Sequence, residues 1–191
     1  MAKQFQQIGD KHRDFIRRQH IFFVASAALG SHVNMSPRST DCFRLLDANT
    51  VAYLDRTGSG NETAAHIHAG GRMTIMLCSF EGPPLIMRLY GNGTVHPLDS
   101  PIYRRLLEEQ FGGVAPLGTR QIVTLDVELV QTSCGFGVPL FDYTGEREAM
   151  DKWAEAKGEA ALEAYRRREN THSIDGLPSG LPPGLLKPEA N

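Results

Sequence analysis

A succession of short apolar runs, separated by turn-forming residues, constrains the fold of this chain more than any other feature. In the clearest run, Val123, Leu125, Val127 and Leu129 alternate with polar residues. This period of two places one face of a strand in a core and the other in water. Other runs rich in β-branched and aromatic residues predict strands at 21–27, 32–36, 42–46, 50–55, 72–80 and 85–92. The chain is therefore predicted to be mainly β.

Helices are predicted around these strands. Apolar spacing favours an amphipathic helix from Phe5 to about Gln19, and a short helix follows the strand at 50–55 and stops at Gly70-Gly71. Ser100-Pro101 resembles an N-cap with proline at the first helical position, which predicts a helix to about Gln110. Residues 145–170 favour two short helices that meet near Gly158.

Length and composition limit the class of protein. The 191 residues suit one domain, predicted over 1–170, with an extended Pro/Gly-rich tail at 171–191. A net charge of -2 gives no electrostatic footprint for nucleic acid. The three cysteines are odd in number and lack CxxC spacing, and the apolar run at 21–28 is too short to span a bilayer. We expect a cytoplasmic protein without nucleic-acid or membrane partners.

The loop from Arg56 to Asn61, RTGSGN, is the first candidate site, because such loops hold phosphates. It offers backbone N–H groups, hydroxyl donors and one cation, and the helix behind it directs its positive end toward the same place. A dinucleotide site is disfavoured, because the third glycine of GxGxxG is missing and the helix is short. GxxxxGK is absent, so an ATP-type P-loop is not indicated.

Other constellations indicate no further chemistry. The seven histidines contain no HExxH, and His66 and His68, two residues apart, would point in nearly opposite directions on a helix, so no metal site is predicted. The sequence leaves open whether one of the histidines is an axial ligand of haem. The run Thr132 to Gly137 lacks GxSxG and is typical of a strand end that turns. No residue is assigned as a catalytic acid or base.

Three segments together resemble the pyridoxamine 5'-phosphate oxidase-like group of FMN-binding split β-barrels. They are FFVASAALGSHVNMSPRSTDCFRLLDANTVAYLDRTGSGNETAAHI, GRMTIMLCSFEGPP and MRLYGNG, which lie between Phe22 and Val95. TSCGFGVP and SIDGLP, nearer the C-terminus, resemble a bacterial subgroup of that family. The resemblance implies a six-stranded antiparallel split barrel with peripheral helices, an α+β protein that works as a homodimer with FMN between the subunits.

The resemblance also implies cofactor-binding residues. Arg38 matches the basic residue that faces the flavin phosphate, and Arg88 matches the arginine in the strand after the hairpin. The family's Ser-Arg-Lys phosphate grip falls on Asn61-Glu62-Thr63, so both cations are replaced and one position is acidic. Ser39 and Thr40 are alternative candidates for polar contact with the ring. The predicted cofactor site comprises Arg38, Ser39, Thr57, Gly58, Ser59, Asn61, Thr63 and Arg88.

The function indicated by the resemblance is that of an FMN-binding flavoprotein, a flavin-dependent oxidoreductase acting on a small molecule of unspecified class. The C-terminal aromatic and basic residues with which pyridoxamine phosphate oxidases complete their site are not matched, so vitamin B6 oxidation is not expected. The alternative is a non-enzymatic dimeric split barrel that lacks flavin, or that binds haem or a deazaflavin. Glu62 favours this alternative, because it would oppose a phosphate.

Overall fold

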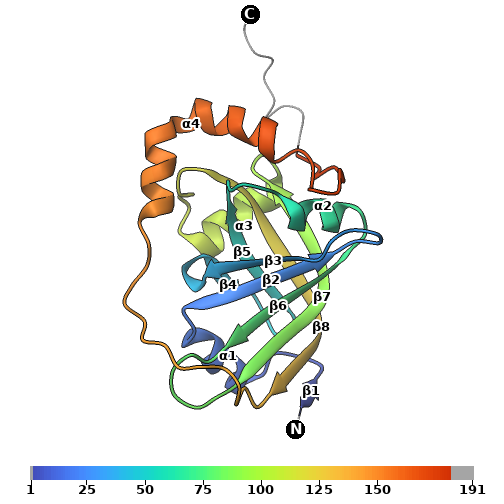
Figure 1. The fold of residues 1–191 in the computed structure, drawn as a ribbon, viewed down its shortest axis with the longest axis vertical. Helices are drawn as coiled ribbons and strands as arrows, with labels where there is room; N and C mark the ends of the chain where they lie inside the picture. The colour runs from blue at the N-terminus through green and yellow to red at the C-terminus, as the bar shows by residue number, and fades with distance from the viewer. Residues whose placement is uncertain (1, 182–191) are drawn as a thin grey trace, which may run out of the picture.

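An antiparallel sheet forms the body of the molecule and curls into a half-barrel (Figure 1). The structure is a computed structural model, and it describes residues 2–181. The strand order is β3-β2-β6-β7-β8-β5-β4, and β1 pairs with β8 outside this path. The strands are β1 (Lys3–Phe5), β2 (Ile21–Ala27), β3 (Asn34–Ser39), β4 (Phe43–Leu45), β5 (Thr50–Arg56), β6 (Arg72–Cys78), β7 (Ile86–Pro97) and β8 (Thr119–Ser133). The split-barrel fold predicted from the sequence is confirmed, with more strands than the expected six.

The N-terminal strand is one departure from the sequence prediction. The helix expected from Phe5 begins only at Asp10, after Gly9 as N-cap, and ends at Arg17 (α1, Asp10–Arg17). Residues 3–5 instead pair with residues 130–132 of β8. The pairing of β5 with β8 covers only residues 119–126 of β8, so the last residues of β8 present backbone groups that β1 satisfies.

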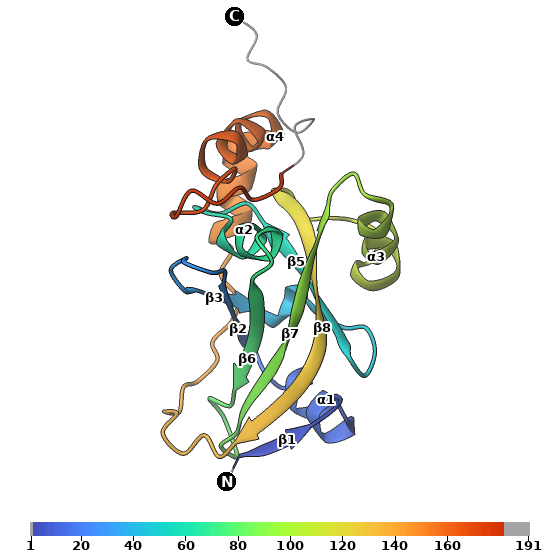
Figure 2. The same ribbon diagram turned by 90° about the vertical axis from the view of Figure 1, so that its right-hand side faces the viewer.

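The two central strands, β7 and β8, are longer than their apolar patterns predicted. Their pairing runs from Ile86 to Pro97 and shifts register between Tyr90 and Gly91. At Gly91 a Cβ atom would lie 1.8 Å from the Asp126 carbonyl oxygen, so only glycine allows this close approach. Figure 2 shows both strands curving along the whole length of the sheet.

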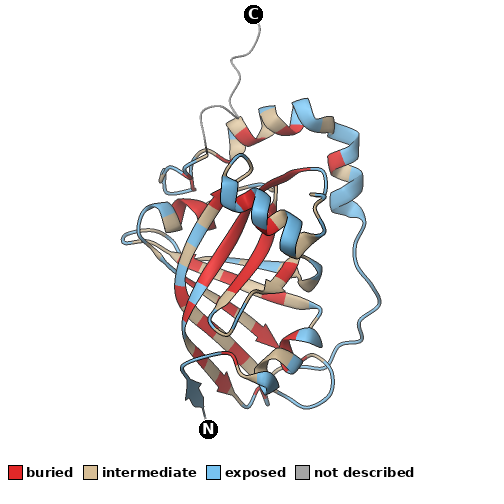
Figure 3. Cartoon of the chain, turned by 180° about the vertical axis from the view of Figure 1, so that it is seen from behind, coloured by how far each residue is buried: buried red, intermediate tan, exposed pale blue. Residues whose placement is uncertain are grey.

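The core fills the concave side of the sheet. Burial alternates strictly along β2, where Phe22 and Val24 are fully buried. They pack with buried side chains of the other strands and with Phe15 and Ile16 of α1. Figure 3 shows the same alternation of buried and partly exposed residues along the strands. A second, smaller cluster joins Leu54 and other residues of β5 and β8 to α3 (Pro101–Phe111).

The remaining helices follow their sequence signals. Ser100 Oγ accepts a hydrogen bond from the Tyr103 N–H at the start of α3, as an N-cap does. Helix α2 (Glu62–His68) follows β5, and Gly70 lies just beyond it with a φ of 75°. Helix α4 (Ala149–Glu169) has non-helical backbone at Gly158 and bends sharply there (Figure 1), which confirms two helical segments meeting at this glycine.

Two segments outside the sheet shape the candidate site. Residues 134–148, named here the strap, run along the outside of the half-barrel from the end of β8 to α4 (Figure 1). Residues 171–181, expected to be extended, instead form turns around a bridge between His172 and Pro178, and the Ser179 N–H donates to the Thr171 carbonyl. The rest of the expected tail, residues 182–191, lies outside the described residues.

Candidate functional site

The loop between β5 and α2, the phosphate cradle expected from the sequence, directs its polar side chains inward. The N–H and the hydroxyl of Thr57 both donate to the Gly118 carbonyl, at 2.7 and 2.8 Å. The buried Asn61 accepts a hydrogen bond from Gln121 Nε2 at 2.9 Å. Ser59 is exposed. Thr57 and Asn61 therefore bond within the protein rather than facing solvent.

The end of α4 and the strand β8 hold the same loop through its carbonyl groups. Arg120 Nη1 donates to the Gly60 carbonyl and to Asn170 Oδ1, both at 2.8 Å. Asn170 Nδ2 donates to the Gly58 carbonyl at 2.9 Å, and Arg166 Nη1 donates to Thr57 Oγ1 at 3.2 Å. Arg120 and Arg166 thus donate hydrogen bonds to the loop from the interior of the protein.

Asp55, the residue just before the end of β5, lies at the centre of this polar network and is 2% exposed. Its Oδ2 accepts hydrogen bonds from Arg120 Nε at 2.8 Å and Gln121 Nε2 at 2.7 Å. Arg38 Nη1 lies 2.7 Å from Oδ1, in an ion pair without hydrogen-bond alignment. Burial alone would raise the pKa of Asp55, but Arg120 and then Arg38 outweigh burial and hold this pKa below its ordinary value.

Arg38 itself is bound by the protein on two sides. Its guanidinium carbon lies 4.9 Å from the centre of the Tyr53 ring, a cation–π distance. Burial would lower the pKa of Arg38, but the attraction of Asp55 outweighs it and raises this pKa further, so the residue stays charged. The positive charge of Arg38 is therefore compensated by Asp55.

The start of α2 meets the C-terminal segment. Both carboxylate oxygens of Glu62 lie within hydrogen-bond distance of the Ile174 N–H, at 3.3 and 3.1 Å. Thr63 Oγ1 accepts a hydrogen bond from Asn34 Nδ2 at 3.1 Å and is buried. Segment 171–181 therefore approaches the helix end that the sequence analysis expected to face a phosphate.

The remaining expected residues lie apart from the loop. Ser39 Oγ accepts a hydrogen bond from the Asp41 N–H and caps the 3₁₀ turn at Thr40–Cys42. Arg88 lies on β7 opposite Gln131 of β8, whereas the loop follows Arg56, which lies opposite Thr119. Twelve residues of β8 separate these two levels, which is roughly 40 Å of strand. The structure therefore does not bring Arg88 and the loop together.

A cavity of about 1120 Å³ lies beside Arg38 and Ser39. Its walls come from the end of α1, the adjoining ends of β2 and β3, the turn between β6 and β7, and the strap. This volume lies just above the range of about 300–1,000 Å³ that is usual for ligand pockets. Two of the eight predicted cofactor-binding residues, Arg38 and Ser39, thus line a cavity large enough for a small molecule.

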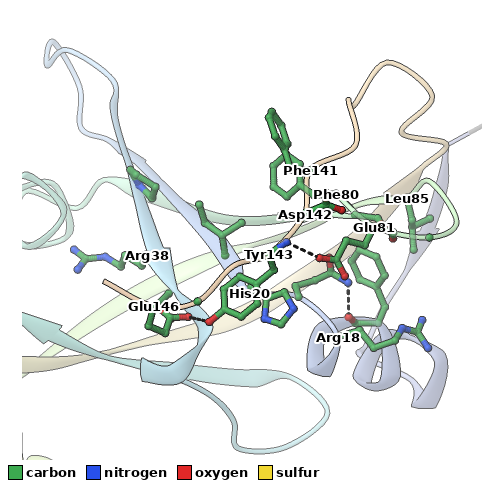
Figure 4. Close-up of a pocket in the computed structure, with 18 of the residues that line it drawn as sticks. Arg18, His20, Arg38, Phe80, Glu81, Leu85, Phe141, Asp142, Tyr143 and Glu146 are labelled. Atoms are coloured by element: carbon green, nitrogen blue, oxygen red, sulfur yellow. Dashed lines mark hydrogen bonds between the residues drawn. The ribbon is translucent and has the colours of Figure 1, made fainter. Parts of the chain in front are cut away.

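Aromatic side chains from distant parts of the chain meet at this cavity (Figure 4). The rings of His20 and Tyr143 are stacked, with centroids 3.7 Å apart and planes 2° apart. Phe80 and Phe141 meet edge to face. The Tyr143 N–H donates to Glu81 Oε1 at 3.1 Å, which fixes the strap against the turn between β6 and β7.

The loop and the cavity differ in how well they fit the two parts of FMN, its phosphate and its ring. The loop does not fit the phosphate of FMN, because Thr57, Asn61 and Thr63 are buried and bonded internally and Glu62 is acidic. The cavity fits a planar ring, because it combines aromatic walls with polar side chains.

The sequence did not reveal the stacking of His20 on Tyr143, because no local pattern indicates it. Sequence analysis also missed Asp55, although a carboxylate at the end of the apolar run VAYLD is a signal for a buried ion pair.

Within residues 2–181, no three side chains of His, Cys, Asp or Glu gather in a way that could hold a metal ion. None of the helices in that range has the length and apolar character needed to cross a membrane. His66, on α2, is buried and bonds through Nδ1 to Ser26 Oγ at 3.0 Å.

Comparison with known proteins gives consistent matches. Residues 8–134 match the family model of pyridoxamine 5'-phosphate oxidase. The chain is 39% identical over 192 residues to the pyridoxamine 5'-phosphate oxidase family protein ustO of Aspergillus flavus, covering 91% of this chain and 76% of that protein.

Solved structures share the fold at lower sequence identity. A variant of HupZ from group A Streptococcus has a TM-score of 0.54 at 21% identity, over 66% of this chain and 99% of that chain. A candidate pyridoxamine 5'-phosphate oxidase from Lactobacillus delbrueckii has a TM-score of 0.52 at 15% identity, over 66% of this chain and 94% of that chain. At these identities the likeness concerns the fold alone.

Proposed function

Because the chain belongs to the pyridoxamine 5'-phosphate oxidase family, we propose that it binds a flavin, FMN being the form the family resemblance implies, in the cavity beside Arg38 and Ser39. The observation that carries this proposal is that two residues expected at the flavin line one large cavity with aromatic walls. Fold alone would not carry it, because one fold hosts many functions.

The cavity residues would bind and orient the flavin ring. Aromatic faces such as those of His20 and Tyr143 suit stacking with a planar ring, and Ile21, Phe80 and Leu85 would exclude water from it. Ser39 and Arg38 supply polar groups at one wall. When bound, a flavin supplies electron and hydride transfer, and the protein supplies position and electrostatics.

The reaction we propose is flavin-dependent oxidation or reduction of a small molecule in the cytoplasm. Cys42, Cys78 and Cys134 are free, which is compatible with a reducing compartment. No side chain is proposed as a catalytic acid or base, so the chemistry would rest on the flavin.

The assembly we propose is a homodimer with the cofactor site at the subunit interface. Exposed apolar side chains on the outer side of the sheet support it: Met35 of β3 is 63% exposed, and Val33 just before β3 is 71% exposed. Such surface favours burial against another chain, and a twofold dimer is the commonest symmetric solution. Sedimentation that showed only monomer at micromolar concentration would contradict this assembly.

A second candidate function is favoured by the loop between β5 and α2, whose polar side chains bond within the protein. Since Thr57, Asn61 and Glu62 do not present a phosphate grip, the chain would serve as a flavin-free split barrel, or as one that binds haem or a deazaflavin. Its histidines include the cavity residue His20.

The test is the visible absorption spectrum of the purified protein, followed by titration with FMN. We expect a flavin band or saturable binding, and at least a tenfold loss of affinity in Tyr143→Ala. Phe136→Ala is the matched control, because Phe136 lies on the same strap, is 81% exposed and does not line the cavity. No flavin band and no binding would refute the proposal, and a Soret band would favour haem.

A further inference from the structure

We infer that Asp55 is an internal anion that occupies Arg38 in place of a ligand phosphate, so that this site recognises the flavin ring and discriminates little between FMN and riboflavin. The inference rests on the proposed flavin function and makes it more specific. Asp55 would then be a residue that determines specificity without touching the ring.

The charge balance around Asp55 is the first argument. Its carboxylate lies within 2.8 Å of donors from Arg38, Arg120 and Gln121, and it is almost completely buried. Arg38, with 19% of its side chain exposed, has one close carboxylate partner already. A phosphate brought to Arg38 would also lie near Asp55, and two anions in a poorly solvated place repel each other. In Figure 4 the Arg38 guanidinium is turned away from His20 and Tyr143.

The closed loop is the second argument. The Thr57 hydroxyl donates to the Gly118 carbonyl and accepts from Arg166, and the Asn61 side chain accepts from Gln121. The carbonyl groups of Gly58 and Gly60 accept hydrogen bonds from Asn170 and Arg120, respectively. The contacts tie the loop to β8 and α4.

The acidic start of α2 is the third argument. Glu62 places a negative charge at the start of α2, where the phosphate grip implied by the family resemblance would lie, and its carboxylate accepts a hydrogen bond from the Ile174 N–H of the C-terminal segment. The phosphate of FMN carries nearly two negative charges at neutral pH. The start of α2 therefore disfavours a phosphate at this position.

The remaining cations of the cavity are Arg18 and Arg147, and both are exposed. Solvent and salt screen charges in such positions, so their effect on a phosphate is small. We therefore expect the dissociation constants of FMN and riboflavin to differ by less than about fivefold, a difference typical of exposed charge pairs.

The first experiment titrates the full-length protein with FMN and with riboflavin in parallel, following flavin fluorescence. A dissociation constant for FMN more than a hundredfold below that of riboflavin would overturn the inference. If neither flavin binds, the proposed function fails instead, so the two failures are distinguishable.

The second experiment asks whether Asp55 sets the preference. In Asp55→Asn, Arg38 loses its anion, and we expect the affinity ratio to move at least tenfold toward FMN. Asp151→Asn is the matched control, because Asp151 lies on α4, pairs with Arg56 of β5 and does not line the cavity. Its loss should leave the ratio unchanged. An unchanged ratio in folded Asp55→Asn would overturn the role of Asp55.

Gly58→Ala tests the loop without touching the buried charges, in case Asp55→Asn does not fold. At Gly58 no atom lies within 4 Å of an added Cβ, and φ is outside the left-handed region. We expect both flavin affinities to stay unchanged. A tenfold loss for FMN alone would mean that the phosphate contacts the loop, and would overturn the inference.

Discussion

Arg120 on β8 and Asn170 at the end of α4 are joined by a hydrogen bond of 2.8 Å, although fifty residues separate them in the chain. Asn170 is fully buried, and its other polar groups are also used: Nδ2 donates to the Gly58 carbonyl, and its carbonyl accepts from Ser179 Oγ. One asparagine thus connects the barrel, the loop after β5 and the C-terminal segment. The conformation of the loop depends on residues that follow the barrel in sequence.

Asn170→Ala should therefore destabilise the whole domain. The substitution leaves Arg120 Nη1 and the Gly58 carbonyl each with one partner fewer in a buried place, which costs about 1–3 kcal/mol in the free energy of unfolding. Urea denaturation followed by far-UV circular dichroism measures it. Asn92→Ala is the control, because Asn92 is exposed on β7 and its side chain donates a hydrogen bond to the exposed Glu128. Equal losses in the free energy of unfolding would mean that the buried hydrogen-bond network contributes no more to stability than an exposed hydrogen bond.

Asp55 should contribute stability that depends on pH. Because its folded pKa is lowered below the ordinary 3.8, its contribution is present above that value and is lost as pH falls through the folded pKa. The urea midpoint of the wild type should fall more steeply between pH 5 and pH 2 than that of Asp55→Asn. Parallel curves would contradict this assignment.

Removal of the Asp55 carboxylate at neutral pH should be more damaging than loss of a surface carboxylate. Asp55→Ala leaves Arg38 and Arg120 without their buried anion, which should cost about 3–5 kcal/mol. Asp151→Ala removes a half-exposed partner of Arg56 and should cost less than about 1 kcal/mol. Urea unfolding at pH 7 compares the two, and similar losses would contradict the central place of Asp55.

Much of the fold could be predicted from the sequence, because its signals are local. The burial of Val123, Leu125 and Val127, the Ser100-Pro101 cap and the break at Gly158 each depend on signals within a few residues, and the structure confirms all three. The predicted alternation does not extend to Leu129, which is only partly buried, because after the register shift Val130 takes the core position instead. The strand at residues 3–5 could not be predicted this way. It exists because the end of β8 offers free backbone groups, and that depends on where β5 stops.

The candidate site was less predictable, because its contacts join distant residues. Arg38 and Asp55 belong to strands that are not neighbours in the sheet, so no spacing in the sequence indicates their ion pair. The stack of His20 on Tyr143 depends on the path of the strap. The glycine-containing loop was correctly found between a strand and a helix, but its burial under α4 follows only from the tertiary structure.

Gly91 should be one of the least tolerant positions in the sheet. In Gly91→Ala the added Cβ would lie 1.8 Å from the Asp126 carbonyl oxygen and 2.8 Å from its carbon, so the backbone of β7 and β8 must separate. We expect a loss of about 3 kcal/mol or more, or failure to fold. Gly137→Ala is the control, since its Cβ would meet no atom within 4 Å, and its effect should be within about 0.5 kcal/mol. Thermal unfolding compares them, and a stable Gly91→Ala protein would contradict the register at this bulge.

His32 and Asp175 should form a pH-dependent contact between the β2–β3 turn and the C-terminal segment. His32 Nδ1 lies 2.6 Å from Asp175 Oδ1, and this hydrogen bond, followed by the Coulombic attraction, raises the pKa of His32 above its ordinary 6.5. The hydrogen bond with His32 in turn lowers the pKa of Asp175. A raised histidine pKa means that the contact is fully present below pH 6.5 and is lost as pH rises through the folded pKa. In an NMR titration, Asp175→Asn should lower the pKa of His32 toward 6.5, whereas Asp151→Asn should leave it unchanged. The same His32 titration in the wild type and in Asp175→Asn would mean that the segment is not held at this point.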